Sequence, residues 1–510
     1  MRIHNFLKSN KDRFPLKDVF VFNDIRITHL KLYEEVRSIS YGLEKLGLKK
    51  DNKVSIILNN SLEFIYTVLA IANIGAVAVP LNISLSDRDL LNQIILTKSN
   101  FLITWEEKVK QLLKKKNKLK IANQKIILIN GKGNKFSKFN DLYMKIPPLK
   151  YKLGINKFSS DCDFIFGLTS GSTSDPKIMK FTQKTKILRS LHAKKLYKLD
   201  ESENIILSTP MYHSISLRLI FLPIIIGSKC IIMEKFTNKN WFSLVEKNNV
   251  TFSILVSPQI ASISTLLDKR NIKKMSSIKS IVSCCSPLDS LTKKKISYKL
   301  QCKFFDTYGA SEVGTITNLK INQDDNKNNT LGKVVPDTKL LFKDQNGKIG
   351  KSIRGQILCK SKNIFSGYFN NNKDNKISFY KDYFITGDVG YLNNNGHLIL
   401  SGREKDIIIT GGVNVFANDV EKVLNLHNQI KESAIIGVKH KILGEVICAF
   451  VITKKNQPFE EEKIKRYCSK LLADYQMPFY YKVVKKFPRG SLNKISKYKL
   501  KLDYKNLNNI

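Results

Sequence analysis

Apolar residues recur along most of the chain at two spacings, one typical of helices and one typical of strands, and the two patterns alternate. Residues 32–48 carry apolar side chains at helical spacing and predict a helix that ends at Gly47. Residues 52–59 predict a strand, and residues 61–75 predict a second helix that stops at Gly75. Such alternation is typical of an α/β fold.

The alternation continues to about residue 400, and the rest of the chain predicts a smaller, separate unit. Its pattern predicts a helix with Asn418 as N-cap, two strands, a helix and a last strand, over residues 418–427, 432–438, 445–453, 460–475 and 480–487. We expect the two units to join near residues 400–412, where charged residues and glycines interrupt two apolar strands. The basic tail after Lys494 is expected to be partly disordered.

A polar loop stands between two strand patterns. Residues 163–168 (DFIFGL) and 177–182 (KIMKFT) alternate as strands, and the loop between them is rich in hydroxyl side chains beside Lys177. Small residues let backbone N–H groups approach an anion, and hydroxyls donate to its oxygens, so the loop could hold phosphate. It is not the GxxxxGK[ST] loop that leads into a helix. Taken alone, a solvated turn is the commoner explanation.

Length and composition fit a protein of several structural units. The chain has 510 residues, of which 42% are hydrophobic, and we expect two to four units. The longest apolar stretches, residues 67–81 and 219–228, are shorter than the roughly 20 residues of a membrane helix and predict buried helices and strands. The N-terminal residues show no apolar signal segment, and the eight cysteines show no CxxC pair. We therefore expect a cytoplasmic protein with no transmembrane segment, zinc site or disulfide framework.

The formal net charge of +43 raises the question of nucleic-acid binding. The cations are mostly Lys and are spread along the whole chain, and no RGG, zinc-finger or basic-zipper pattern accompanies them. We expect no specific nucleic-acid partner. A diffuse positive field would still attract anionic ligands such as nucleotides.

Four further motifs follow the polar loop in a fixed order: DTYGASEVG (306–314), ITGDVGYL (385–392), SGREKDIIITGGVNVFANDVE (401–421) and PRGSLNKISK (488–497). Together with the loop and the upstream segment 59–82, they resemble the AMP-forming adenylating enzymes, which include acyl-CoA synthetases, firefly luciferase and peptide-synthetase adenylation domains. The resemblance covers nearly the whole chain, and five motifs matched in one order exclude coincidence.

The resemblance implies a fold and a reaction. The fold is a large N-terminal AMP-binding domain (1–400) of layered α/β subdomains with a small barrel-like part, a hinge (401–406) and a mobile α+β C-terminal domain (407–510). In the reaction a carboxylate attacks the α-phosphate of MgATP, which gives an acyl-adenylate and pyrophosphate. A thiol, usually that of CoA, then displaces AMP. The implied cofactors are ATP, Mg²⁺ and CoA.

The matched residues acquire roles only through this resemblance. The β- and γ-phosphates would be bound by a loop supported by Lys177 and formed by Thr169, Ser170, Gly171, Ser172 and Thr173. Adenine would lie against Tyr308, next to Gly309 and beside Ser286 and Pro287.

Charged groups complete the implied site. Ser311 would contact the α-phosphate, and Glu312 would hold Mg²⁺ as a hard oxygen ligand. Asp388 and Arg403 would bind the ribose. Lys405 stands at the hinge position, about which the small domain swings between half-reactions. Lys494 would stabilise charge developing on the α-phosphate. Outside their motifs the simpler explanations are a surface acid for Glu312, a turn residue for Asp388 and one more tail lysine for Lys494.

The sequence departs from the family pattern in the polar loop, in the closing motif, at the floor of the acyl pocket and at Ala417, which replaces the usual proline. Ser174 and Ile178 replace glycines of the loop, and Asn493 replaces a glycine of the closing motif. Cys284 and Cys285 stand where the family has small glycines, and their side chains would narrow the floor of the acyl pocket. A redox-active pair is the alternative to two small hydrophobes.

The acid and the thiol are less well defined. The stretch at His213 has no acid to bind an amino group and resembles the acyl-CoA synthetase form, with His213 as a gate or pocket wall. A hydrogen-bonded structural histidine is the competing explanation. Gly411 and Gly412 would let a pantetheine arm pass close to the backbone. We therefore expect an acyl-CoA ligase for a fatty or other apolar acid, and the narrowed floor favours a short, slender or aryl one.

Two alternatives remain open. The first is a stand-alone adenylation enzyme that loads an acyl carrier protein, docked through the positive surface. The second is a non-catalytic nucleotide-binding relative, suggested by Ser174, Ile178 and Asn493.

Overall fold

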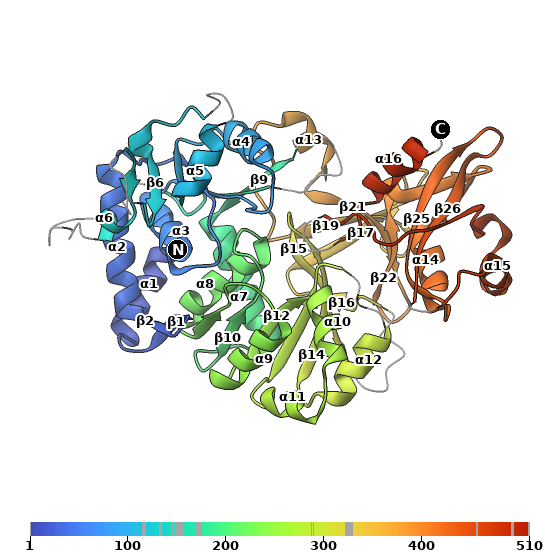
Figure 1. The fold of residues 1–510 in the computed structure, drawn as a ribbon, viewed down its shortest axis with the longest axis horizontal. Helices are drawn as coiled ribbons and strands as arrows, with labels where there is room; N and C mark the ends of the chain where they lie inside the picture. The colour runs from blue at the N-terminus through green and yellow to red at the C-terminus, as the bar shows by residue number, and fades with distance from the viewer. Residues whose placement is uncertain are drawn as a thin grey trace. The chain divides into compact units, whose positions relative to one another are not determined.

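The computed structural model describes residues 2–114, 119–131, 135–143, 147, 158–168, 176–286, 288, 290–321, 330–454, 457–490 and 494–507. The chain divides into two compact units. Figure 1 shows the fold, coloured along the sequence from the N-terminus to the C-terminus. The first unit comprises the described residues up to 321 together with 361–377, and the second comprises 330–360 and the described residues from 378 onward. The predicted boundaries at residues 400 and 406 stay a prediction.

The first unit is built from strands alternating with helices. Its strands are β1 (Asp18–Phe22), β2 (Ile25–Thr28), β3 (Lys53–Ile56), β4 (Val77–Pro80), β5 (Phe101–Trp105), β6 (Ile126–Ile129), β7 (Ser137–Lys138), β8 (Asp163–Leu168), β9 (Ile178–Thr182), β10 (Asn204–Leu207), β11 (Lys229–Ile232), β12 (Phe252–Val256), β13 (Ser280–Cys284), β14 (Lys303–Ala310) and β15 (Gly314–Ile321). Its helices are α1 (Ile3–Arg13), α2 (His29–Lys45), α3 (Leu62–Ile74), α4 (Asp87–Leu96), α5 (Glu106–Leu113), α6 (Asn140–Tyr143), α7 (Gln183–Tyr197), α8 (Ser214–Ile226), α9 (Asn238–Lys247), α10 (Ser257–Thr265), α11 (Lys269–Lys274), α12 (Ser290–Lys299) and α13 (Asn372–Ile377).

Two sheets organise this unit. One has the strand order β7-β6-β5-β3-β4-β8-β9, and the other contains the order β15-β14-β13-β12-β10-β11-β1-β2. The inner strands are parallel, and β8/β9 and β14/β15 are antiparallel. Parallel neighbours require crossover connections, here mostly helices, which explains the alternation seen in the sequence. The α/β fold class is confirmed.

Apolar side chains from helices and strands fill the space beside the second sheet. Helices α9, α10 and α12 contribute Trp241, Ile260 and Ile296 to a buried cluster with Ile281 and Phe304 of the strands. These helices lie beside the green and yellow strands in Figure 1. All five residues of β12 are buried, as expected of a parallel strand covered on both faces.

The predicted helix ends are confirmed in the first unit. Helix α2 ends at Lys45, and Gly47 follows with φ +87°. Helix α3 starts after Ser61, whose Oγ accepts a hydrogen bond from the backbone N–H of Phe64 at 3.3 Å. It ends at Gly75, whose φ of +79° is the left-handed conformation that glycine adopts without strain.

The second unit is mainly β-structure. Its strands are β16 (Lys333–Val334), β17 (Thr338–Lys343), β18 (Ile349–Gly350), β19 (Gly355–Ser361), β20 (Phe379–Tyr380), β21 (Tyr383–Leu392), β22 (Leu398–Arg403), β23 (Ile407–Thr410), β24 (Val413–Phe416), β25 (Ile430–His440), β26 (Gly444–Thr453) and β27 (Tyr480–Val483), and its helices are α14 (Ala417–Leu426), α15 (Glu461–Ser469) and α16 (Lys497–Leu507). One sheet has the order β18-β17-β19-β21-β20 with β22 on β21, and another has β24-β23-β26-β25 with β27 on β26.

Several details of the second unit differ from the sequence-based expectation, among them the last strand, which ends at Val483 and not at residue 487. Asn418 lies inside α14, which starts one residue earlier with Phe416 at the N-cap and no side-chain cap. Helix α15 ends at Ser469, and residues 474–476 form a separate 3₁₀ turn. The basic tail forms helix α16, because Leu500 packs against a core that includes Phe450 and Phe487. None of the helices in the described ranges is long and apolar enough to cross a membrane.

A buried ion pair lies beneath the end of β14. Lys293 of α12 and Asp306 of β14 are 2.7 Å apart, and their side chains are 3% and 2% exposed. Burial raises the pKa of the Asp306 carboxyl, and Lys293 opposes that rise. The pair therefore holds α12 against the strand that leads to the YGASE motif.

We predict that Lys293→Met lowers the free energy of unfolding by about 3–5 kcal/mol, because Asp306 is left as an unpaired buried charge. The double substitution Lys293→Met/Asp306→Leu is expected to recover most of that loss. Urea titration of the three proteins measures both effects. A single variant as stable as the wild type would show that the pair contributes nothing.

Candidate functional site

The polar loop lies between two antiparallel strands, as predicted. Strand β8 leads into it and β9 leads out, with Leu168 opposite Ile178. The loop residues Thr169–Thr173, and Ser174 after them, lie outside the described residues. Lys177 is described, and its Nζ lies 3.0 Å from Asp374 Oδ2 and 5.2 Å from the centre of the Tyr368 ring.

Glu312 stands in the turn between β14 and β15 and accepts three hydrogen bonds at two of its atoms. Its carboxylate Oε1 accepts a hydrogen bond from the Tyr368 hydroxyl at 3.0 Å. Its backbone carbonyl accepts from the Phe365 N–H at 2.7 Å and from Arg189 Nη2 at 2.9 Å. Within the described part of the chain, Oε2 of Glu312 accepts no hydrogen bond. That oxygen is therefore suited to bind a hard cation such as Mg²⁺.

Arg189 links this turn to a distant segment. Its side chain is 4% exposed, and Nε donates to the carbonyl of Asn363 at 2.9 Å while Nη2 donates to that of Glu312. Burial lowers the pKa of Arg189 to about 9, and the nearby charge of Arg218 acts in the same direction. Tyr368, Asp374 and Arg189 were not identified from the sequence, because they lie outside the motifs or within a helix that shows no special pattern.

Near its end, strand β14 carries Tyr308, which matches the aromatic residue of the family motif, and Gly309, a position that only glycine can occupy. Tyr308 is half-buried, and the pairing of β14 with β15 is irregular between Tyr308 and Gly309. A Cβ at Gly309 would come within 2.1 Å of the Gly314 carbonyl oxygen, so this position needs glycine. Ser311 is exposed just before Glu312. The motif thus places a ring near the end of β14 and a carboxylate in the turn that follows.

Cys284, Cys285 and Ser286 lie at the end of β13, in the first unit. Ser257 Oγ donates to the carbonyls of Ser286 and Cys284, the latter at 3.2 Å. The two sulfur atoms are 3.9 Å apart, and both cysteines are half-buried. Cys285 has a φ of +80°, a conformation that favours glycine and is strained for cysteine. Pro287 lies outside the described residues.

His213 is the N-cap residue of α8 and is half-buried. Its ring lies 4.4 Å from that of Tyr212, and burial lowers its pKa to about 4. A neutral imidazole at this position fits a pocket wall and equally a structural residue, so both explanations of His213 remain.

The second unit brings Asp388 and Arg403 together. They are directly paired between β21 and β22, and Arg403 Nε lies 3.3 Å from Asp388 Oδ1. Asp388 is 8% exposed and follows Gly387, whose φ is +73°. Thr386 Oγ1 accepts a hydrogen bond from the Asp388 N–H at 3.1 Å, which fixes the start of this turn.

The remaining candidates of the second unit lie at turns. Lys405 is in a short 3₁₀ turn, Glu404–Asp406, between β22 and β23. Lys494 is exposed, and its carbonyl accepts a hydrogen bond from the Gly490 N–H at 2.8 Å. Asn493 lies outside the described residues. The roles of Lys405 and Lys494 stay predictions.

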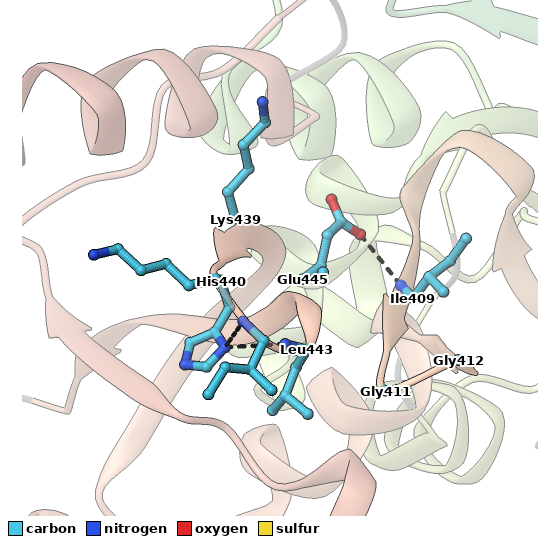
Figure 2. Close-up of a pocket in the computed structure, with 10 residues that line it drawn as sticks. Ile409, Gly411, Gly412, Lys439, His440, Leu443 and Glu445 are labelled. Carbon is cyan, nitrogen blue, oxygen red and sulfur yellow. Dashed lines mark hydrogen bonds between the residues drawn. The ribbon is translucent and has the colours of Figure 1, made fainter.

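A pocket of about 940 Å³ surrounds Gly411 and Gly412 in the second unit. Figure 2 shows its wall, in which His440 Nδ1 accepts hydrogen bonds from the N–H groups of Ile442 and Leu443 at 3.3 and 3.2 Å. Both glycines have positive φ values, +54° and +81°. Their lack of a side chain keeps this part of the wall open.

Two family models together match most of the chain. The model described as "AMP-binding enzyme" matches residues 7–369, and the one described as "AMP-binding enzyme C-terminal domain" matches residues 419–494. Two curated relatives each share 24% identity with this chain. They are the 2-succinylbenzoate–CoA ligase of Bacillus licheniformis, over 97% of this chain and 99% of the relative, and the long-chain-fatty-acid–CoA ligase of Bacillus subtilis, over 98% and 94%.

The fold is also similar to that of a solved protein, the o-succinylbenzoate CoA synthetase (MenE) of Bacillus subtilis in complex with the acyl-adenylate OSB-AMP. The TM-score is 0.84 at 23% identity, and the match covers 98% of each chain. A second structure of the same protein contains ATP and a magnesium ion. The similarity supports the layered α/β arrangement of the first unit and the smaller unit that follows.

We predict that the His213 ring stays neutral down to about pH 5, because burial disfavours the charged imidazolium. NMR of protein labelled at histidine, with His213→Gln to assign the signal, measures the titration. A midpoint near the ordinary value of about 6.5 would show that the ring is open to solvent.

Proposed function

Because the chain belongs to the AMP-binding enzyme family, we propose that it is an AMP-forming acid–CoA ligase. It adenylates a carboxylic acid with MgATP, releases pyrophosphate, and transfers the acyl group to CoA with release of AMP. The observation that carries this proposal is the fixed position of Glu312, whose backbone and one carboxylate oxygen are tethered while the other oxygen accepts no bond from any described residue. The motif match and the CoA-ligase relatives support it.

The first half-reaction brings an anionic acid against an anionic phosphate, so cations and oriented donors must offset the repulsion. Glu312 would bind Mg²⁺, which neutralises charge on the phosphates when it is bound. Lys177, beside Asp374 and the Tyr368 ring, would support the phosphate loop. Tyr308 and Ser286 would flank adenine, and Ser311 would donate to the α-phosphate.

The ribose and the second half-reaction depend on the smaller unit. Asp388, oriented by Thr386 and paired with Arg403, would accept hydrogen bonds from the ribose hydroxyls. Lys494 would stabilise charge on the α-phosphate, and Lys405 would act as the hinge. The open wall at Gly411 and Gly412 would admit the pantetheine arm of CoA.

The acid class is the least defined part of the proposal. The relatives named above act, by their names, on an aromatic acid with two carboxylates and on long-chain fatty acids. The expectation of a fatty acid therefore has no specific support over an aryl acid. We favour an aryl acid, since the side chains of the half-buried Cys284 and Cys285 would narrow the floor of the acyl pocket relative to the glycines of the family.

We expect the protein to catalyse ATP–pyrophosphate exchange with one class of acid and to form AMP when CoA is added. Lys494→Ala is expected to slow exchange by roughly 100- to 1,000-fold, since it removes one cation that acts on the developing charge. The measurement is a panel of short, medium, long and aryl acids, with Lys499→Ala as the matched tail-lysine control. ATP binding without exchange with any acid would identify a non-catalytic relative. Exchange without CoA-dependent AMP release would point to another acceptor, such as a carrier protein.

We also predict that Tyr368→Phe weakens the response to Mg²⁺, because the hydroxyl that orients the Glu312 carboxylate is lost. Exchange should fall about 5- to 10-fold at limiting Mg²⁺, as expected for one hydrogen bond to a charged group, and recover as Mg²⁺ is raised. Magnesium titrations of this variant and of Tyr298→Phe, whose ring is 78% exposed on α12, measure the effect. A uniform loss at all Mg²⁺ concentrations would assign Tyr368 a purely structural role.

A further inference from the structure

Three cationic side chains gather between α7 and α8 in the first unit. Lys186 and Arg189 of α7 are 3% and 4% exposed, and Arg218 of α8 is half-buried with its Nε fully enclosed. Lys186 Nζ lies 3.8 Å from the centre of the Phe181 ring, and Arg189 Cζ lies 4.9 Å from the same ring. The ring face contributes a weak cation–π attraction to both groups, which does not replace a counter-charge.

Within the described residues this cationic cluster has no ion-pair partner, although the charge of Glu312 is close enough to oppose the fall in the pKa of Arg189. In the part of the chain that the structure describes, no carboxylate forms an ion pair with Lys186, Arg189 or Arg218, and Arg218 Nε has no hydrogen-bond partner. Arg189 donates only to backbone carbonyls, and the nearby Asp306 is paired with Lys293. Burial lowers the pKa of Lys186 well below its usual value, and the charges of Arg189 and Arg218 act in the same direction. Buried cations without a partner are costly, so the cluster is suited to accept an anion.

Arg218 lies where the candidate site residues converge. Its Nη1 is 3.4 Å from Oγ1 of Thr315, three residues after Glu312. It is also close enough to Cys284 for its charge to oppose the rise in that thiol's pKa, which the neighbouring Cys285 and burial cause. Five residues before it on the chain, His213 caps the same helix. Arg218 therefore lies close to residues that the resemblance assigns to the acyl pocket, and its charge also acts on Lys186 and Arg189.

We propose that Arg218, backed by Lys186 and Arg189, binds a second carboxylate of the acid substrate. The acids accepted are then dianions, with one carboxylate adenylated and the other held by the cluster. The inference rests on the proposed ligase function and narrows its substrate class. It replaces the expectation of a fatty or other purely apolar acid. The hydrophobic residues of α8 are buried and form the core of the unit, whereas Arg218 is the charged position on this helix.

The experiment compares matched pairs of acids in ATP–pyrophosphate exchange. Each pair consists of a monocarboxylate and the same acid with a second carboxylate: propanoate and succinate, heptanoate and octanedioate, and 4-oxo-4-phenylbutanoate and 2-succinylbenzoate. The enzymes are the wild type, Arg218→Met, Arg218→Lys and the control Arg270→Met, an exposed arginine on α11. Thermal unfolding of each variant checks that it is folded.

We expect the best wild-type substrate to be a dianion. Arg218→Met should lower kcat/KM for that acid about 100-fold, the usual effect of removing one partner of a buried charge pair, while its monocarboxylate partner changes little. Arg218→Lys should retain part of the preference, and Arg270→Met should behave as the wild type.

Three results would overturn the inference while leaving the ligase function intact. One is a wild type that uses a monocarboxylate as well as its dianionic partner. Another is an undiminished preference for the dianion in Arg218→Met. The third is an equal loss for both acids of a pair, which would show that Arg218 acts on ATP. Failure of the ligase proposal looks different, since the wild type would then show no exchange with any acid.

Discussion

The guanidinium of Arg189 joins segments that are far apart in the sequence. From helix α7 it donates to the carbonyl of Glu312, in the turn between β14 and β15, and to the carbonyl of Asn363. The segment that contains Asn363 also carries Tyr368, whose hydroxyl orients the Glu312 carboxylate. A lysine could not reproduce this bridge, because two separate planar N–H donors are needed at once. The position of the candidate metal ligand thus depends on a residue that would not contact the metal.

Charge in the first unit is arranged unevenly. Asp306 is neutralised by a buried lysine, whereas Lys186, Arg189 and Arg218 have no such partner among the described residues. An isolated charge is destabilising in the protein interior. The paired Lys293 and Asp306 are therefore suited to a structural role, and the unpaired cationic cluster is suited to bind an anionic ligand. The same contrast separates a stability effect, expected at Lys293, from a specificity effect, expected at Arg218.

The backbone at two residues of the candidate site, Cys285 and Gly309, is conformationally constrained. Cys285 has a positive φ where the family resemblance expects a small glycine, so the substitution has kept the backbone path and added a side chain to it. Gly309, by contrast, has no room for any side chain against the Gly314 carbonyl. Close packing against the Gly314 carbonyl therefore requires glycine at position 309.

Local patterns in the sequence were sufficient for the helices and strands that have strong spacing and clear ends. Helices α2 and α3 end at their glycines as predicted, because a left-handed residue stops a helix wherever it stands. The motif residues Glu312, Asp388 and Arg403 were predicted from the order of their motifs along the chain. The chemistry proposed for them requires specific side chains, and such a requirement can be recognised in the sequence.

Other features were decided only by the tertiary structure. Asn418 is of a residue type that favours the N-cap position, but α14 begins at Ala417, directly after β24 ends at Phe416. The tail folds into α16 because its apolar face meets a core from distant strands. Arg189, Tyr368 and Arg218 acquire their roles from partners up to 174 positions away, such as Asn363. No local pattern marks such residues, because burial and charge balance belong to the folded chain as a whole.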